Sequence, residues 1–234
     1  MPDTAPAPAA ILLDALGTLV ALEPPAPHLR SELATRFGVD VSEAEAARAI
    51  AAEIAYYRAH LDEGRDSAGL AALRRRCADV LRSALPEGLA GRLELDPLVD
   101  ALLASLRFRA YPDVRPALQA ARARGQRLVV VSNWDVSLVG VLRGLELEPL
   151  LNGILTSAVV GARKPAAAIF EQALALARVG PDQAIHVGDS LAEDVAGARA
   201  AGIEPVLIRR GGGPPVPGVR TVSSLSEVIT PAPT

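Results

Sequence analysis

The sequence predicts an α/β fold in which a three-layer core surrounds a parallel β-sheet and an all-helical domain is inserted after the first strand. The apolar run at residues 10–13 has the length and composition of a buried strand, and it ends at the carboxylate of Asp14. Residues 22–108 carry helical patterns without a convincing strand between them. From Tyr111 onward, strands and helices alternate, which is the pattern of a parallel sheet with crossover helices.

The inserted region begins after residues 23–27, whose three prolines we expect to break any regular element. Ser42 followed by Glu45 is the sequence of a capping box, and Asp96-Pro97 is typical of an N-cap with Pro at the first helical position. The predicted helices span residues 28–37, 42–61, 67–85 and 97–108. We therefore predict a helical domain over residues 22–108 and a core domain formed by residues 1–21 and 109–234.

The second half of the core domain alternates between the two kinds of element. The predicted strands cover residues 127–131, 154–157, 184–187 and 205–208. The predicted helices cover residues 113–125, 136–145, 166–178 and 194–202, with Asp113 and Asp194 at the start of the first and last. Residues 209–218 are rich in Gly and Pro and lack the Lys and Ser/Thr of a phosphate-binding loop, so we predict an ordinary loop there.

Composition excludes several classes of protein. With 234 residues, 50% of them hydrophobic, the chain can bury a core of its own. The formal net charge is −3 and no long basic run occurs, which argues against nucleic acid or an anionic membrane as a partner. The first ten residues lack the basic start and apolar stretch of a signal peptide, and no apolar run approaches membrane-spanning length. Cys77 is the sole cysteine and reads as a small buried hydrophobe, so we expect a reducing, cytoplasmic location.

Three predicted strands end in polar side chains. Asp14 follows the first strand, Ser132 and Asn133 end the second, and Asp189 follows the strand at residues 184–187. Because right-handed crossovers keep these strands parallel, their carboxyl ends meet at one edge of the sheet. We expect the ligand site there.

Two more residues are expected at this edge of the sheet. Lys164, the only lysine of the chain, precedes a predicted helix, and Asp194 lies about one helical turn beyond Asp189. Carboxylates gathered around one point repel each other unless a divalent cation is present, and an oxygen-only ligand set suits Mg²⁺. A lysine and a hydroxyl beside a metal suit a phosphoryl group, whose oxygens need neutralising in the transition state.

These residues resemble the motifs of the haloacid dehalogenase superfamily of hydrolases, and the resemblance covers nearly the whole chain. The four matching stretches are Asp14-Ala-Leu-Gly17-Thr18, Val131-Ser132-Asn133, Lys164-Pro165, and Gly188-Asp189-Ser190 with Glu193-Asp194. The helical insertion after the first stretch is similar to that of subclass I, which has an α-helical cap. The resemblance implies a Rossmann-like core with an inserted cap domain.

The resemblance also implies a role for each motif residue. Asp14 would be the nucleophile and would form an aspartyl ester. Ser132 and the amide of Asn133 would bind the transferring group, and Lys164 would pair with the nucleophile and the phosphate. The implied Mg²⁺ ligands are Asp14, the backbone carbonyl of Leu16, Asp189 and Asp194, partly through water.

Leu16 departs from the phosphatase pattern of this superfamily. Phosphatases carry a second Asp at that place, two residues past the nucleophile, which protonates the leaving group and then activates water. Loss of general acid–base help typically lowers a rate by about a hundred- to ten-thousand-fold. Asp135, just past the second motif, is a candidate replacement, although it also fits an N-cap for the helix from Val136.

The departure at Leu16 leaves two other functions open. In 2-haloacid dehalogenases halide leaves without a proton, and their first motif similarly reads Asp-Ala-x-Gly-Thr. Those enzymes need no metal, do not keep the aspartate pair seen at Asp189 and Asp194, and need a cap arginine for the substrate carboxylate. Candidate arginines are Arg30, Arg36, Arg48 and Arg58. The third possibility is a weakly catalytic phosphate-binding or regulatory protein. A Schiff-base phosphonoacetaldehyde hydrolase is excluded, because no lysine lies between Asp14 and Lys164.

The remaining polar and aromatic candidates point to packing. His186 lies inside a predicted buried strand and is expected in the core. His28 and His60 lack metal-ligand spacing. Trp134 fits either a substrate entrance or packing. Tyr56 and Tyr57 are adjacent positions of a helix in the inserted region, and the sequence leaves open whether either faces the cleft.

The sequence thus predicts a Mg²⁺-dependent phosphatase that acts on a small phosphorylated metabolite through an aspartyl-phosphate on Asp14. We expect a monomer or homodimer with a small-molecule substrate.

Overall fold

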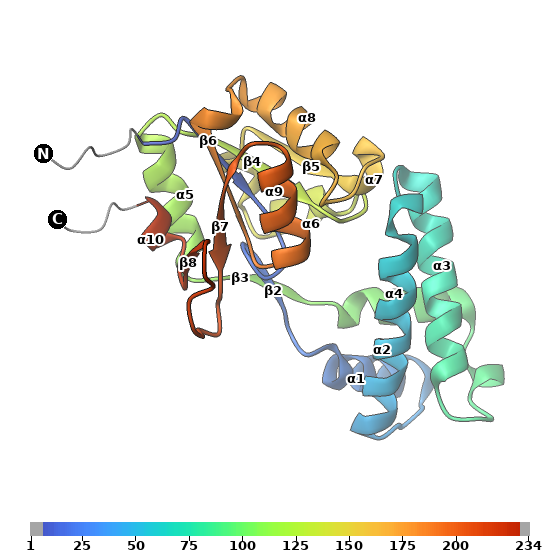
Figure 1. The fold of residues 1–234 in the computed structure, drawn as a ribbon. Coiled ribbons are helices and arrows are strands. Elements are labelled where there is room, and N and C mark those ends of the chain that lie inside the picture. Colours follow the sequence, from blue (N-terminus) through green and yellow to red (C-terminus); the bar gives the residue numbers. More distant parts are fainter. Residues whose placement is uncertain (1–6, 230–234) are drawn as a thin grey trace, which may run out of the picture. The chain divides into compact units, whose positions relative to one another are not determined.

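The computed structural model describes residues 7–229, which divide into two compact units (Figure 1). The core unit consists of residues 7–21, 110–134 and 138–229. The helical unit consists of Leu22–Arg109 and the short segment Asp135–Ser137. That residues 22–108 act as a separate cap domain stays a prediction. No local sequence pattern indicates that residues 135–137 belong with the helices.

A six-stranded sheet forms the centre of the core unit and confirms the predicted parallel α/β fold. The strands are β1 (Ala10–Leu13), β4 (Arg127–Ser132), β5 (Gly153–Thr156), β6 (Ala184–Gly188), β7 (Glu204–Ile208) and β8 (Arg220–Val222). Their spatial order is β5-β4-β1-β6-β7-β8, and each of these neighbouring pairs is parallel. The first strand is therefore central, with Leu13 opposite both Val130 of β4 and Val187 of β6. Its four side chains are buried because helices cover both faces of the sheet.

Helices α8 (Ala167–Ala177) and α9 (Ala196–Ala200) cover one face of the sheet, where Ile169 and Phe170 pack against Leu12 and Val129. Helix α5 (Val114–Ala123) packs against β4 on the opposite side (Figure 1). The other helical elements of this unit are α6 (Leu138–Gly144), α7 (Ser157–Val160), α10 (Ser226–Ile229), and the short turns η3 (Glu148–Leu150) and η4 (Pro181–Gln183).

The segment after β6 differs from the prediction. We expected a helix that starts at Asp194, but a π-helical turn, η5 (Leu191–Val195), comes first and leads into α9. The amides of Asp194 and Val195 both donate to the carbonyl of Ser190, and the Ser190 hydroxyl caps the turn by accepting from the amide of Glu193. Ser190 is thus the N-cap of this turn, in place of Asp194.

The helical unit is an α-helical bundle with its own apolar core. Its helices are α1 (Pro25–Phe37), α2 (Glu43–His60), α3 (Ser67–Ala84) and α4 (Leu95–Ser105), with the short turns η1 (Leu61–Glu63) and η2 (Ala90–Arg92). The capping box of Ser42 and Glu45 is confirmed, since both reciprocal bonds are present. Buried side chains from all four helices, among them Leu33, Ile50, Leu81 and Leu98, form one cluster.

Two predicted helix starts in this unit are wrong. Pro25 stands at the first position of α1, where the missing N–H costs nothing, so the proline-rich stretch begins a helix instead of breaking one. Helix α4 begins at Leu95 after Glu94, and the Asp96 carboxylate pairs with Arg75 on α3 instead of capping its own helix.

A two-stranded ribbon joins β2 (Val20–Leu22) to β3 (Phe108–Ala110). The chain leaves the core unit through β2 and returns through β3. The ribbon and β8 were not predicted, because strands of three residues are too short to show a pattern. Among residues 7–229, none of the helices combines the length and the apolar character needed to cross a bilayer.

Candidate active site

Two carboxylates stand at the ends of neighbouring strands. Asp14 follows β1, Asp189 follows β6, and the amide of Asp14 donates to the carbonyl of Val187 at 2.9 Å. The parallel register of β1 and β6 therefore places both carboxylates at the same edge of the sheet, as the sequence predicted.

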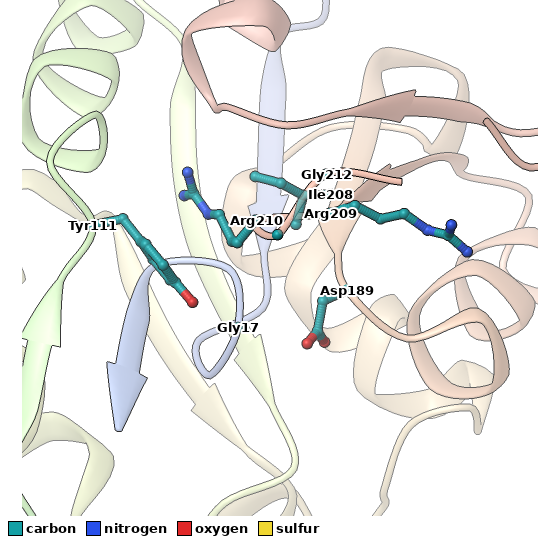
Figure 2. A pocket seen from close by; sticks show the side chains of 8 residues that line it. Gly17, Tyr111, Asp189, Ile208, Arg209, Arg210 and Gly212 are labelled. Atoms are coloured by element: carbon teal, nitrogen blue, oxygen red, sulfur yellow. The ribbon is translucent and has the colours of Figure 1, made fainter. Parts of the chain in front are cut away.

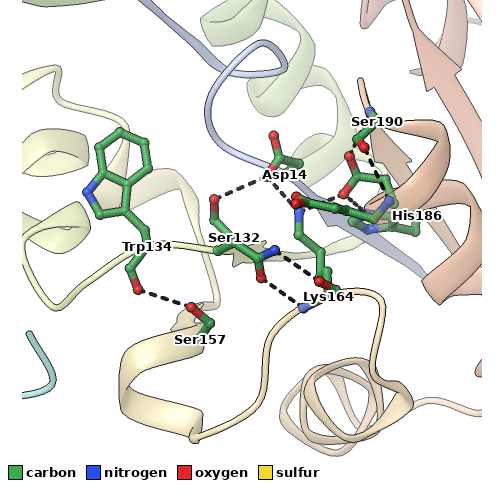
Figure 3. Close-up of polar contacts among 10 residues, drawn as sticks. Asp14, Ser132, Trp134, Ser157, Lys164, His186 and Ser190 are labelled. Atoms are coloured by element: carbon green, nitrogen blue, oxygen red, sulfur yellow. Dashed lines mark hydrogen bonds and ion pairs between the residues drawn. The ribbon is translucent and has the colours of Figure 1, made fainter. Parts of the chain in front are cut away.

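Lys164 links two of the acidic residues (Figure 3). Its Nζ lies 2.7 Å from Asp14 Oδ1 and 2.6 Å from Asp194 Oδ1, and its side chain is only 1% exposed. Burial on its own lowers the pKa of Lys164, but the two carboxylates more than offset this and raise it above its usual value. Lys164 is therefore a fixed positive charge between the two aspartates.

Asn133 holds Lys164 in place through the backbone. Its side-chain Oδ1 accepts from the amide of Lys164 at 2.8 Å, and its Nδ2 donates to the carbonyl of Lys164 at 3.0 Å. The neighbouring Ser132, the last residue of β4, donates from Oγ to Asp14 Oδ1 at 3.1 Å. Ser132 thus touches the expected nucleophile, whereas the side chain of Asn133 serves the loop that carries Lys164.

The Asp194 carboxylate reaches the site from the π-helical turn and is buried. Its Oδ1 accepts from Lys164 Nζ and lies 2.9 Å from His186 Nε2, and its Oδ2 accepts from the amide of Ser190 at 3.0 Å. A Cβ at Gly188 would collide with this carboxylate, so the glycine of the motif is required for the close approach. Burial on its own raises the pKa of Asp194, but Lys164 and His186 lower it below its usual range.

Asp14, Asp189 and Asp194 form a group that suits a divalent cation. Each offers one carboxylate oxygen, and these oxygens lie within 4.8 Å of one another. Burial and the other two carboxylates raise the pKa of Asp189 to about 6, and burial also raises the pKa of Asp14 despite the nearby Lys164. Three carboxylates share one ammonium group here, so negative charge is in excess. An all-oxygen donor set with uncompensated negative charge fits Mg²⁺.

The turn after Asp14 approaches Asp189 closely. Gly17 has a φ of 81°, a conformation that favours glycine, and a Cβ there would meet the Asp189 carboxylate. Leu16 forms a bridge with Val20, and the amide of Gly17 donates to the carbonyl of Val20 at 2.8 Å. The Gly-Thr turn of the first motif therefore keeps room for the carboxylate of the fourth motif.

A cavity of about 380 Å³ opens beside Asp189 (Figure 2). Its lining comes from the turn after β1, the end of β3 and the loop after β7: Gly17, Tyr111, Asp189, Ile208, Arg209, Arg210, Gly211 and Gly212. Of the three carboxylates, Asp189 therefore contributes to the wall of this cavity.

Arg210 organises one wall of this cavity, which sequence reasoning missed. Its Nη1 lies 2.7 Å from both carboxylate oxygens of Asp113, its guanidinium donates to the carbonyl of Thr18, and it stacks 4.2 Å from the ring centre of Tyr111. The prediction that Asp113 caps α5 is wrong. Asp113 precedes this helix, but its carboxylate binds Arg210 and Ser224 instead of the helix amides. Burial raises the pKa of Asp113, but these hydrogen bonds lower it overall.

The remaining candidates lie elsewhere. Asp135 belongs to the helical unit, where its Oδ1 accepts from the amide of Ser137 at 2.7 Å and its Oδ2 accepts from the Tyr57 hydroxyl at 3.0 Å. Cys77 is buried in the same unit, and burial together with Glu53 raises its pKa well above the usual range, as expected of an unreactive thiol.

Comparison with known proteins agrees with this geometry. Residues 8–202 match the model of a hydrolase family described as haloacid dehalogenase-like hydrolase. A human protein named haloacid dehalogenase-like hydrolase domain-containing protein 3 is 44% identical over 91 residues, which cover 39% of this chain and 36% of that protein. A phosphatase of Mycobacterium tuberculosis is 35% identical over 147 residues, covering 60% of this chain and 67% of that protein. A phosphoserine phosphatase of Thermus thermophilus is 34% identical over 134 residues, covering 56% and 54%. The chain thus spans about half the length, or less, of most curated relatives it matches.

Solved structures share the fold. A HAD phosphatase from Thermococcus onnurineus and a 2-haloacid dehalogenase from Pseudomonas syringae each superpose with a TM-score of 0.64 at 24% identity, covering 94% of this chain and 95% of theirs. Since one fold carries both activities at the same similarity, the likeness to these structures does not choose between them.

Proposed function

We propose a phosphatase function for this chain, which belongs to the haloacid dehalogenase-like hydrolase family. The proposed reaction is Mg²⁺-dependent hydrolysis of a small phosphoric monoester, with Asp14 as the nucleophile. The observation that carries it is the group of three carboxylates, Asp14, Asp189 and Asp194, with oxygens within 4.8 Å of one another around the buried Lys164. The phosphatases named among the relatives support it.

In this proposal the carboxylate of Asp14 attacks phosphorus. A bond forms between a carboxylate oxygen and phosphorus, the bond from phosphorus to the leaving oxygen breaks, and water then hydrolyses the aspartyl-phosphate to release inorganic phosphate. Lys164 offers positive charge to the nucleophile and the phosphoryl oxygens, and Ser132 orients the carboxylate through its hydroxyl. Mg²⁺, held by Asp14, Asp189, Asp194 and the backbone carbonyl of Leu16, would neutralise the charge of the transferring group.

Leu16 restricts the substrates that this arrangement can serve. It offers no acid to the leaving oxygen, and the candidate replacement Asp135 already binds the Tyr57 hydroxyl and the amide of Ser137. Substrates whose leaving group needs little protonation, such as acyl or aryl phosphates, are therefore preferred. We further propose that the helical unit acts as the cap that excludes water from the site.

Dehalogenation is the second candidate, because Leu16 is no handicap when halide leaves. The acidic group argues against it, since a dehalogenase has no need of a cation and three neighbouring carboxylates without one repel each other.

Hydrolysis of para-nitrophenyl phosphate and of 2-chloropropionate, each with Mg²⁺ and with EDTA, tests the proposal. We expect phosphate release that EDTA abolishes and that Asp14→Asn eliminates, while Asp182→Asn, a change of an exposed aspartate, leaves it intact. Chloride release that is indifferent to EDTA would identify a dehalogenase instead. Silence on both substrates would point to a phosphate-binding protein without efficient turnover.

A further inference from the structure

His186 is a polar residue at a place where the fold calls for an apolar one. It lies in the middle of β6 between Ile185 and Val187, opposite Leu12 of β1, and its side chain is 0% exposed. Its ring makes a T-shaped contact with the ring of Phe170 of α8, with 4.9 Å between ring centres and 87° between planes. A leucine or phenylalanine would suit this apolar environment without a polar atom to satisfy.

One ring nitrogen of His186 has a partner and the other has none. Nε2 lies 2.9 Å from Asp194 Oδ1, while Nδ1 is buried without a hydrogen-bond partner among the described residues. Because an ionised carboxylate only accepts, Nε2 must carry the proton of this bond. The ring is thus committed to Asp194, and its other nitrogen contributes nothing to the core.

Asp194 Oδ1 has two donors, and they differ in what else they do. Lys164 Nζ also binds Asp14, so its position depends on the state of the nucleophile. His186 is fully buried on its strand and contacts Phe170, and Asp194 is its one hydrogen-bond partner among the described side chains. His186 is therefore the donor that fixes Oδ1 independently of the nucleophile.

We propose that His186 is a positioning residue that holds the Asp194 carboxylate in the orientation needed to bind the divalent cation. The inference rests on the proposed Mg²⁺ dependence. A donor that fixes a ligating carboxylate typically accounts for about 10–100-fold in metal affinity. Removal of the ring should therefore weaken Mg²⁺ binding without loss of the fold, since Lys164 and the amide of Ser190 still bind the Asp194 carboxylate.

Calorimetric titration of Mg²⁺ alone, together with thermal unfolding in EDTA, tests the inference on three variants. His186→Leu removes the donor and keeps an apolar side chain. His186→Gln keeps an N–H that can reach the place of Nε2. Phe170→Leu is the matched control, because it disturbs the same packing and leaves the hydrogen bond in place.

We expect His186→Leu to bind Mg²⁺ about 10–100-fold more weakly, with an unfolding temperature in EDTA that falls no further than that of Phe170→Leu. His186→Gln should regain much of the affinity. Phe170→Leu should show the reverse pattern, a lower unfolding temperature with native Mg²⁺ affinity. Native affinity in His186→Leu, or equal losses of affinity and stability in His186→Leu and Phe170→Leu, would overturn the inference and make the ring a packing residue. If the unmodified protein itself binds no Mg²⁺, the metal proposal fails first, and the inference fails with it.

Discussion

Lys164 Nζ lies 2.7 Å from Asp14 Oδ1, with 1% of the lysine side chain and 8% of the aspartate side chain exposed. The only lysine of the chain is thus placed against the expected nucleophile and shielded from solvent. Because Asp194 pairs with the same ammonium group, removal of the Lys164 side chain affects two buried carboxylates at once.

Lys164→Met should destabilise the metal-free protein by about 3–5 kcal/mol, because removal of one member of a buried ion pair leaves the other charged group uncompensated. Urea unfolding in EDTA measures the loss. Saturating Mg²⁺ should restore part of the stability, since the cation supplies the missing positive charge. An equal loss with and without Mg²⁺ would mean that no cation binds between these carboxylates.

Mg²⁺ affinity should fall as the pH is lowered from 7 to 5. The pKa of Asp189 is raised to about 6, so protons compete with the cation over this range. Asp189→Asn should bind Mg²⁺ more weakly and with a flatter pH dependence. The Mg²⁺-induced shift in unfolding temperature at several pH values provides the measurement, and a pH-independent shift in the unmodified protein would contradict the prediction.

The raised pKa of Asp189 also determines how the stability of the metal-free protein changes with pH. A carboxylate whose pKa is higher in the folded state than in the unfolded state binds more protons when folded, so its contribution to stability decreases as the pH rises from about 4 to 6. Mg²⁺ should remove this decrease at the upper end of the range.

Arg210→Met should lower the free energy of unfolding by about 3 kcal/mol, because Asp113 and the carbonyl of Thr18 lose their partly buried partner. The neighbouring Arg209→Met is the matched control. Among residues 7–229, the Arg209 side chain donates only to the carbonyl of Pro214 in its own loop, so the expected loss is about 0.5 kcal/mol or less. Denaturant unfolding of both variants checks the difference, and equal losses would show that the Arg210 network adds nothing.

Gly17→Ala should weaken Mg²⁺ binding as well as the fold. Its φ of 81° is unfavourable for alanine, and the new methyl group would meet the Asp189 carboxylate. Gly38→Ala separates the two effects, because Gly38 has a φ of 61° with nothing within 4 Å of the added carbon. We expect Gly38→Ala to lose about 1–2 kcal/mol of stability from backbone strain alone. Calorimetry should show native Mg²⁺ affinity for Gly38→Ala and a clear loss for Gly17→Ala.

Local sequence signals predicted most of the core. The apolar runs that end at Asp14 and Ser132 place both side chains correctly, because strand length and the polar residue at its end are properties of a few neighbouring residues. The capping box at Ser42 is local in the same way.

Residues whose partners are distant in sequence escaped prediction. Asp113 fits a helix cap by its position, yet its side chain pairs with Arg210, 97 residues further along the chain. Asp96 likewise binds Arg75 on another helix. A carboxylate binds a guanidinium more strongly than it binds the amides at a helix start. Whether a guanidinium lies within reach depends on the tertiary fold, which local sequence does not show.

The segment Asp135–Ser137 bears on how this chain can be recombined with its relatives. Its backbone and side chain join the helical unit through the Tyr57 hydroxyl and the carbonyl of Gly64, although it lies between β4 and α6 in the chain. A Cβ at Gly64 would collide with Asp135, so the two positions fit only as a pair. A chimera that exchanges residues 22–109 with those of a relative would therefore replace Gly64 while keeping the Asp135 side chain that packs against it. Successful grafts must carry residues 135–137 along with the helices, because the helical unit of this chain is built from two separate segments.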